Sequence, residues 1–339
     1  MLEPLGSSLL VVQSKKRVKI HIHTNTPDVA AKKLSDYGDL IQQKVDDMVL
    51  QNADLKTHQK IALVTDSIAD LPDDLRSGTD IHVFPLTIMV GQHAYLDRST
   101  LTASQFYEDV DTYPEYPSSS QPSVAQVEKY FSQLLTHYTE LLVVSVSSGM
   151  SGTYSVFSQA AEKLKNVHVF DTKVNSVAQG LLVLHAHKAI QAGKSINVIL
   201  EELNQLRDHT KIFVSVNTLK YMVKMGRVSA RLAKIAAILN MKPVVSIDED
   251  GKGITLGSAF SNTQSIKRVF KELDKALKGR KLLRYAIVHG NDLERAEAMA
   301  KTLTEKFKME PSFVSEISTI VAMSAGPKTF AIALQSTEK

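Results

Sequence analysis

From residue 60 onward, short apolar runs alternate with segments whose apolar residues recur at helical spacing. A run such as LLVVSV (141–146) is apolar at nearly every position, which is typical of a parallel strand covered by helices on both faces. The pattern therefore predicts βαβ units and an N-terminal α/β domain with a parallel sheet over residues 60–210. Strands are expected at 60–65, 81–90, 140–147 and 167–171, and helices near 102–110, 123–138, 152–165 and 175–208.

The pattern changes after about residue 211. The stretch VVSIDEDGKGITLGSAF (244–260) carries Asp250-Gly251 between two alternating runs, which is a hairpin signal. Further strands are expected in RYAIVHG (284–290) and FVSEISTIV (313–321). These segments predict a second α/β domain with a mixed sheet over residues 211–339.

Residues 1–50 form a third block with few large apolar side chains. LLVV (9–12) and RVKIHIHT (17–24) predict two strands, and DVAAKKLSDYG (28–38) predicts a helix that ends at a glycine. So short a block cannot hold a core of its own, so it must dock on another part of the molecule or be the remnant of a larger domain. The polar residues 51–59 are expected to be a linker.

Composition excludes several classes of protein. The chain is 43% hydrophobic and 22% charged, and its net charge of +4 is too balanced for a nucleic-acid-binding protein. It has no cysteine, so disulfides and thiolate chemistry are excluded, and a cytoplasmic location is expected. The longest apolar stretch, 177–192, is interrupted by charged and histidine side chains, and the first residues lack the features of a signal peptide.

Polar side chains follow several strands of the predicted parallel sheet. They occur in Thr65-Asp66-Ser67, in YPSSSQPS (116–123), in SVSSGMSGTYS (145–155) and in Phe170-Asp171-Thr172. Because ligands bind beyond the carboxyl ends of parallel strands, these segments are expected to converge on one site. Taken singly, Asp66 and Ser67 would only cap the next helix.

The residue types at this site favour binding over catalysis. Asp66 alone could be a nucleophile, a metal ligand, a substrate clamp or a cap, and Ser151 lies in a G-M-S-G-T segment that lacks the last glycine of a nucleophile elbow. Neither a phosphate-binding loop nor a dinucleotide fingerprint follows any strand. His21 and His23 share one strand face, without a further ligand cluster. No metal or cofactor is expected.

Six ordered motifs resemble the DegV family, whose members bind fatty acids and carry them for bacterial fatty acid kinase. The resemblance covers about residues 60–336 and rests on KIALVTDSIADLP (60–72), SSSQPS (118–123), SSGMSGTYSVFSQA (147–160), VFDTKVNSVAQG (169–180), LKYMVKMGRVS (219–229) and LNMKPVV (239–245). It implies the two-domain fold of the EDD superfamily, with a long apolar tunnel between the domains. It also implies a function: a long-chain fatty acid lies in the tunnel, and a kinase subunit phosphorylates its carboxylate to the acyl phosphate used in phospholipid synthesis.

The resemblance also implies site residues. Ser119 holds the place of the family's threonine in the T-S-Q-P-S loop, and Ser151 is the serine of the S-G-T-Y motif, so both are expected to contact the fatty-acid carboxylate, with Ser120 and Gly152 beside them. Asp66 and Ser67 are the family signature at the first strand end, so they are also expected to belong to the carboxylate site.

Near the carboxy terminus the chain departs from the family. Ser324 stands where the family has the histidine of H-x-G-P-G, and His289 on the preceding strand end is a candidate substitute.

The first block resembles part of the kinase component of this system, a dihydroxyacetone-kinase-like protein. GSSLLVVQSKKRVKIHIHTNTP (6–27) is similar to the tail of the C-terminal domain of that kinase, which implies a remnant of a kinase–carrier fusion. The expected partners are thus a fatty acid and a kinase subunit, with no nucleic acid, no transmembrane segment and at most transient membrane contact.

The segment between Lys211 and Ile247 contains no acidic residue and several basic ones. Arg227 is at the family's G-R-[IV]-S position, so it is expected on the kinase or phosphate side of the site. The chain alone is expected to catalyse nothing. The alternatives are a hydrolase or phosphotransferase that uses Asp66 or Ser151, and a diverged DegV paralogue that binds another apolar ligand.

Overall fold

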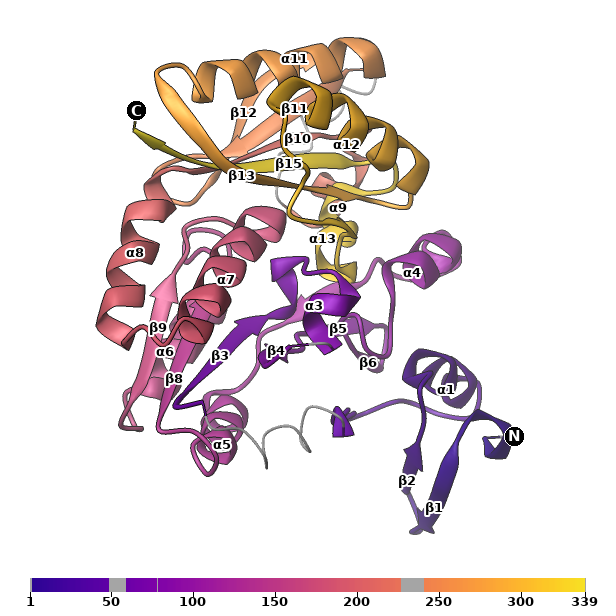
Figure 1. Cartoon of the computed structure of the whole chain (residues 1–339). Helices are drawn as coiled ribbons and strands as arrows, with labels where there is room; N and C mark the ends of the chain where they lie inside the picture. The colour runs from indigo at the N-terminus through magenta and orange to yellow at the C-terminus, as the bar shows by residue number, and fades with distance from the viewer. Residues whose placement is uncertain (1, 49–58, 78, 227–240, 339) are drawn as a thin grey trace.

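The computed structural model describes residues 2–48, 59–77, 79–226 and 241–338 (Figure 1). Two larger sheets dominate this part of the chain. Sheet I has the strand order β4-β3-β8-β9, and sheet II has the order β12-β11-β10-β15-β13-β14. None of the described helices is both long and apolar enough to cross a membrane.

Sheet I is wholly parallel, as the apolar runs predict. Its outer face packs against two helices through aromatic side chains that include Phe131 and Phe157. All six residues of β3 are buried, so the polar end of this strand lies inside the protein. The elements are β3 (Ile61–Asp66), β4 (Ile81–Phe84), β8 (Glu140–Ser145) and β9 (Val167–Asp171), with α5 (Val124–Leu134) and α6 (Thr153–Ala161).

A small antiparallel sheet lies beside sheet I and carries the SSSQPS loop. The single strand predicted over 81–90 is in fact two strands in different sheets, β4 and β5. Pro85 separates them, because proline has no N–H to donate to a ladder. The elements are η2 (Ser67–Ala69), α3 (Asp73–Ser77), β5 (Thr87–Val90), β6 (His93–Leu96), α4 (Ala103–Asp109) and β7 (Ser118–Ser120).

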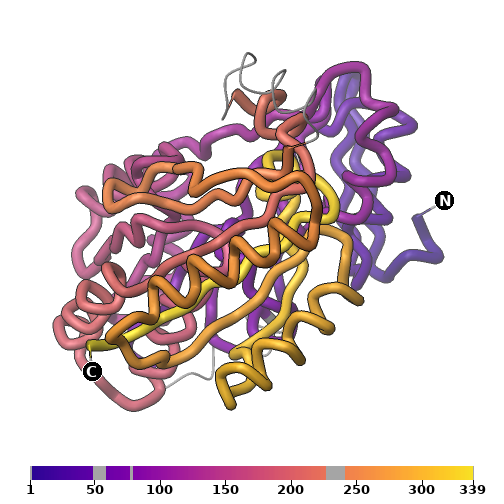
Figure 2. The backbone as a smooth tube through the Cα atoms, turned by 90° about the horizontal axis from the view of Figure 1, so that it is seen from above, coloured from indigo at the N-terminus to yellow at the C-terminus, as the bar shows by residue number. Residues whose placement is uncertain are grey.

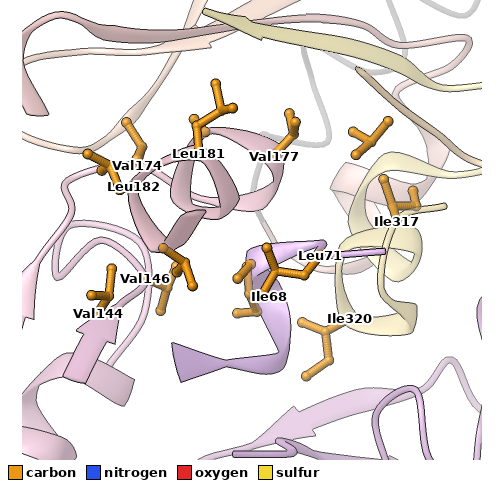
Figure 3. Packing of buried hydrophobic residues seen from close by; sticks show 14 of the residues in the cluster. Ile68, Leu71, Val144, Val146, Val174, Val177, Leu181, Leu182, Ile317 and Ile320 are labelled. Atoms are coloured by element: carbon orange, nitrogen blue, oxygen red, sulfur yellow. The ribbon is translucent and has the colours of Figure 1, made fainter. Parts of the chain in front are cut away.

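One helix, α7 (Ser176–Gln191), lies between the two larger sheets and contacts both. Twelve of its 16 residues are buried, and only its last turn exposes side chains, those of Lys188 and Gln191. Its side chains join residues of both sheets in one apolar cluster, which Figure 3 shows around Val177, Leu181 and Leu182. The single helix predicted over 175–208 is in fact two helices, α7 and α8 (Ile196–Asp208). The chain turns between them at Gly193, whose φ of +73° is a left-handed conformation that glycine adopts readily.

Sheet II is mixed, as predicted, with one parallel pair between β13 and β14. Helices α11 and α12 cover its outer face (Figure 1), and α9 follows β10. The Asp250-Gly251 hairpin is confirmed, since β11 and β12 pair antiparallel around it. The elements are β10 (Thr210–Ser215), α9 (Lys220–Lys224), β11 (Lys242–Ile247), β12 (Gly253–Ala259), α11 (Asn262–Ala276), β13 (Arg280–His289), α12 (Leu293–Phe307), β14 (Val314–Glu316) and β15 (Phe330–Glu338).

The strand predicted over 313–321 is wrong beyond Glu316. The chain turns there into the short helix α13 (Thr319–Ala325), because the Ser318 hydroxyl accepts a hydrogen bond from the Val321 N–H and caps the helix. By sequence α13 belongs to the second half of the molecule. Its residues Ile320, Ala322 and Met323 nevertheless pack in the apolar cluster around α7.

The first block forms a two-stranded sheet and one helix at the periphery of the molecule (Figures 1 and 2). Its helix contacts α4: Lys32 Nζ donates to Asp109 at 2.8 Å, and Gln105 Nε2 donates to Asp28 at 2.9 Å. The hairpin leaves Leu10, Val11 and Val12 more than half exposed. The elements are η1 (Glu3–Leu5), β1 (Ser7–Gln13), β2 (Val18–His23) and α1 (Pro27–Ser35).

Candidate functional site

Asp66 ends β3 and is fully buried. Its Oδ1 accepts from the Ile68 N–H and from Gln179 Nε2, each at 3.1 Å, and its Oδ2 accepts from the Val146 N–H at 2.8 Å and the Ser145 hydroxyl at 3.4 Å. Burial raises the pKa of Asp66 to about 6, and these hydrogen bonds oppose the rise. The carboxylate thus caps η2 and ties the end of β3 to the end of β8.

The neighbouring residues Thr65 and Ser67 are also buried and engaged. The Thr65 hydroxyl donates to the Val144 carbonyl at 2.8 Å, and the Ser67 hydroxyl accepts from the Leu86 N–H at 3.2 Å. The polar side chains at the first strand end therefore bond to other groups of the protein and stabilise this part of the fold.

The ends of β8 and β9 meet in a second polar junction. Asp171 accepts from the Ser148 N–H at 3.1 Å and from the Ser148 hydroxyl at 2.5 Å, while the Thr172 hydroxyl donates to the Ser145 carbonyl at 2.8 Å. The ends of three neighbouring strands of sheet I are thus hydrogen-bonded to one another through these side chains, while their convergence on one ligand site stays a prediction.

The loop after β7 reaches the loop that precedes α6. A Cβ added to Gly152 would lie 1.6 Å from Gln121 Nε2, so the Gln121 side chain lies directly against the backbone of the second loop. Ser151 is partly exposed, and its hydroxyl lies 2.9 Å from the Thr153 hydroxyl and accepts from the Thr153 N–H at 3.2 Å. Ser119 and Ser120 are exposed on β7. The four predicted positions thus lie on two adjacent segments: Ser119 and Ser120 on β7, and Ser151 and Gly152 in the loop before α6.

The β11–β12 hairpin brings sheet II to the same region. The Ser147 hydroxyl donates to the Gly251 carbonyl at 2.8 Å, and Lys173 Nζ donates to the Glu249 carbonyl at 3.2 Å. A Cβ at Gly149 would lie 2.7 Å from the Asp250 carbonyl oxygen. The loop after β8 is therefore covered by backbone from the second half of the chain.

Ser324 lies in the last turn of α13 and is partly exposed. The Tyr116 hydroxyl, two residues before β7, donates to the Met323 carbonyl at 2.6 Å, and the Tyr107 hydroxyl donates to the Gly326 carbonyl at 3.2 Å. A Cβ at Gly326 would lie 2.3 Å from the Tyr221 ring. Tyr116 therefore links the helix that carries Ser324 to the loop that carries Ser119.

A positive charge lies beside these aromatic side chains. Lys224 Nζ is 4.5 Å from the centre of the Tyr116 ring, within range of a cation–π contact. Lys220 Nζ is 3.4 Å from an Asp111 carboxylate oxygen. Arg227, three residues after Lys224, lies outside the described residues, so its role stays a prediction.

A polar network missing from the sequence-based prediction joins the two halves near the other end of α13. Asp70 Oδ1 accepts from Arg98 at 2.9 Å and from the Ser318 N–H at 2.6 Å, and its Oδ2 accepts from the Ser176 hydroxyl at 2.5 Å. Burial raises the pKa of Asp70, opposed chiefly by the Arg98 guanidinium. Asp70 has a φ of 48°, a left-handed conformation that the sequence does not reveal.

Two hollows in the described part of the chain bear on the site. One, of about 310 Å³, lies between the halves and is lined by Arg98, His289 and Glu316 among others. It adjoins the start of α13, whereas Ser324 is near the end of that helix. The other, of about 580 Å³, follows one stripe of α11 that includes Ile266 and Phe270. The expected tunnel between the domains stays a prediction.

Metal-binding clusters of three or more histidine and acidic side chains do not occur among the described residues. His21 and His23 do lie together on β2, with ring centres 5.0 Å apart. Burial lowers the pKa of His289, whose Nδ1 accepts from the Asp292 N–H at 3.3 Å. This imidazole is thus a neutral structural acceptor at the smaller hollow.

Comparison with protein families gives two matches in one chain. The model of the DegV family matches residues 60–337, and the model of the FakA-like middle domain, which belongs to a subunit of fatty acid kinase, matches residues 1–55. The resemblance of the first block to the kinase is confirmed. The matching part of the kinase is its middle domain, whereas the sequence motif suggested the C-terminal domain.

Individual relatives agree with the first match. A DegV domain-containing protein from Clostridium acetobutylicum is 29% identical over 272 residues, covering 79% of this chain and 96% of the relative. Among solved structures, a fatty-acid-binding DegV family protein from Thermus thermophilus has a TM-score of 0.76 at 28% identity, covering 82% of this chain and all of its own. DegV from Bacillus subtilis, described as a fatty acid binding protein, has a TM-score of 0.72 at 27% identity, with 82% and 100% coverage.

Proposed function

Because the chain belongs to the DegV family, we propose that it binds a long-chain fatty acid and presents the carboxylate to a fatty acid kinase subunit. The kinase transfers the γ-phosphoryl group of ATP to a carboxylate oxygen, which yields the acyl phosphate and ADP. One observation carries this proposal: a family with fatty-acid-binding structures and a kinase-derived domain occur together in one polypeptide.

The hydroxyl-rich loops supply the head-group site. Ser119, Ser151 and Ser324 are each exposed or partly exposed, and the contacts of Gln121 and Tyr116 hold their elements near one another. A hydrogen bond to a carboxylate contributes about 1.5–3 kcal/mol. Each buried methylene of the tail contributes about 0.8 kcal/mol, so the tail sets the affinity and the hydroxyls set the position of the carboxylate.

Asp66 and Ser67 act indirectly in this proposal. Both are buried, and the four donors that surround the Asp66 carboxylate leave it no open side for a ligand. They hold the ends of β3 and β8 in place beneath the Ser151 loop.

The same contacts argue against catalysis by the chain alone. An activated serine needs a base within hydrogen-bond reach, and the partners of the Ser151 hydroxyl are the hydroxyl and N–H of Thr153. Asp66 is enclosed by donors that would have to be displaced before it could attack a substrate. The hydrolase and phosphotransferase alternatives therefore have no activated group at these two positions.

The fatty acid kinase is the proposed protein partner, and the cytoplasm, where ATP is available, is the proposed location. Lys224 lies beside the Ser324 end of the site, where its charge favours the approach of an ATP-bound partner and of the phosphoryl group. On its sequence motif alone, we propose that Arg227 also serves the kinase or phosphate.

Lipid extraction tests the binding step. Protein purified from a bacterial host should release a long-chain fatty acid, identified by mass spectrometry, in about one equivalent. Incubation with ATP and a fatty acid kinase should then yield acyl phosphate, trapped with hydroxylamine. Protein that carries no fatty acid and takes up none would contradict the proposal, as would hydrolase turnover by the chain alone.

Ser151→Ala tests the site. Loss of one donor to the carboxylate should weaken fatty-acid binding about tenfold and reduce acyl phosphate formation. Ser155→Ala is the matched control, because Ser155 is exposed one turn further along α6 and pairs with Gln159. Equal behaviour of the two variants would remove Ser151 from the site.

A further inference from the structure

Helix α13 is held at both ends by residues from the first half of the chain. At its start, Asp97 Oδ1 accepts from the Thr319 N–H at 2.8 Å, and the Thr319 hydroxyl donates to the Leu101 carbonyl at 2.8 Å. Asp70 accepts from the preceding N–H, that of Ser318, at 2.6 Å. Two carboxylates therefore satisfy N–H groups that a helix start leaves without partners.

Burying the charged carboxylate of Asp97 costs free energy, because it loses its contact with water. Asp97 is 1% exposed, and burial raises its pKa to about 6, opposed chiefly by Arg98. Arg98 donates to Asp70 and to the Glu316 carbonyl, each at 2.9 Å, so its guanidinium pairs directly with Asp70 and attracts the Asp97 carboxylate without a hydrogen bond to it. Apolar residues would pack here at lower cost, whereas a buried charge network fixes one orientation of the groups that it joins.

At the other end, the Tyr116 hydroxyl donates to the Met323 carbonyl at 2.6 Å. Met323 immediately precedes Ser324, and Thr319 is five residues before it, about 8 Å along a helix axis. In so short a helix, a shift at the start is transmitted to the last turn. The two anchors thus determine where the Ser324 hydroxyl lies.

We propose that Asp97 and Tyr116 are positioning residues for the fatty-acid carboxylate. They hold α13 at its two ends and so fix the position of Ser324 relative to the segments that carry Ser119 and Ser151. This inference rests on the proposed function, because it assigns a role within that binding site. Neither side chain is required to touch the ligand.

Two probes with the same tail separate positioning from general loss of structure. Palmitic acid carries the carboxylate, and hexadecan-1-ol lacks it. Their affinities for delipidated full-length protein are measured by calorimetry. Asp97→Asn keeps the side-chain volume but offers the Thr319 N–H a neutral and weaker acceptor, so it should weaken the binding of palmitic acid by up to about tenfold. The binding of hexadecan-1-ol should stay within about twofold of wild type. Tyr116→Phe, which removes one hydroxyl, should show the same selective loss.

Glu272→Gln is the matched control. Like Asp97, Glu272 is a buried carboxylate; it pairs with Arg268, but it lies on α11 and does not bond to α13. This variant should bind both probes like wild type.

The outcomes are distinct. Wild type that binds neither probe overturns the proposed function. Wild type that binds both, with Asp97→Asn and Tyr116→Phe unchanged toward palmitic acid, overturns only the positioning role. Equal weakening of both probes also overturns it, since that result indicates a loosened fold. If Asp97→Asn does not fold, the result with Tyr116→Phe decides.

Discussion

At Ser324 the chain has a neutral hydroxyl in the position where the family resemblance implies histidine. We expect Ser324→His to bind a fatty acid more tightly than wild type, by up to about tenfold below pH ~6.5, where the imidazole is protonated and donates a charge-assisted hydrogen bond. The gain should fade toward pH 8. The ratio of variant to wild-type affinity across pH 5.5–8 is the measurement, because the ligand's own titration cancels in it. A flat ratio of one would mean that the exchange has no consequence for binding.

Asp66 gives the protein a distinctive dependence of stability on pH. Its folded-state pKa of about 6 lies above the ordinary value of 3.8, so the folded chain holds this proton more tightly than the unfolded chain. The contribution is fully present below pH ~4 and is lost as the pH rises through about 6, by up to about 3 kcal/mol.

Asp66→Asn should remove this dependence. The free energy of unfolding of wild type minus that of the variant should fall between pH 4 and pH 7, as measured by urea unfolding of both proteins. Asp97 contributes a similar slope in both proteins and therefore cancels. A difference that rises with pH would mean that the carboxylate is stabilised, not penalised, by its surroundings.

Among the elements, the β11–β12 turn joins sheet II to sheet I and leaves little space for a side chain at Gly251. Gly251 has a φ of +77°, and an added Cβ would lie 2.1 Å from the Ser147 hydroxyl oxygen. Gly251→Ala should lower the free energy of unfolding by about 1–3 kcal/mol through strain and displacement of Ser147. Gly253→Ala is the control, since no atom lies within 4 Å of its added Cβ. Equal stability of the two variants would show that this contact is unimportant.

The first block contacts the rest of the molecule through α1 and through Leu40, whose N–H donates to His93 Nδ1 at 3.2 Å and whose carbonyl accepts from the Ala94 N–H at 2.7 Å. The Lys32–Asp109 pair is exposed, and exposed ion pairs contribute about 0–1 kcal/mol. We therefore expect a chain that lacks residues 1–50 to remain folded and lipid-loaded, and residues 1–50 alone to lack a cooperative unfolding transition. Thermal unfolding and lipid extraction of both pieces provide the measurement. Aggregation of the shortened chain would assign the block a structural role instead.

Most elements of sheets I and II follow from the sequence, because each is specified by a local pattern. The exceptions have physical reasons. Residues 313–321 alternate like a strand, and only the capping hydroxyl of Ser318 ends that pattern. The break at Gly193 depends on one positive φ, and the split at Pro85 on one missing N–H. Such single-residue events are too weak to outweigh a long pattern.

The candidate site was predictable only in part. The serine loops carry motifs, so Ser119 and Ser151 stand out in the sequence. Asp97 and Arg98 lie in none of the motifs, because their importance arises from partners far along the chain, as with Asp97 and Thr319. Sequence alone cannot reveal a pairing that only the tertiary fold creates.

At the scale of the whole molecule, α7 joins the two sheets in one apolar cluster. We propose domains at 60–210 and 211–339, as the sequence suggests, yet α7 packs against both sheets, so neither half can bury its core alone. We expect one thermal transition for residues 60–339, with equal calorimetric and van't Hoff enthalpies. The isolated fragment 60–210 should be unfolded or aggregated. Two resolved transitions would show that the halves are independent.

The order of strands in sheet II has a consequence for synthesis in the cell. β15 lies between β10 and β13 and is hydrogen-bonded to both, yet it follows every other strand along the chain. While the ribosome is still translating, the half-made sheet has an open gap at its centre, and one side of α7 stays uncovered. Nascent chains with such exposed apolar surface are prone to aggregate. Production of this protein should therefore depend on chaperones during translation far more than its finished stability would suggest.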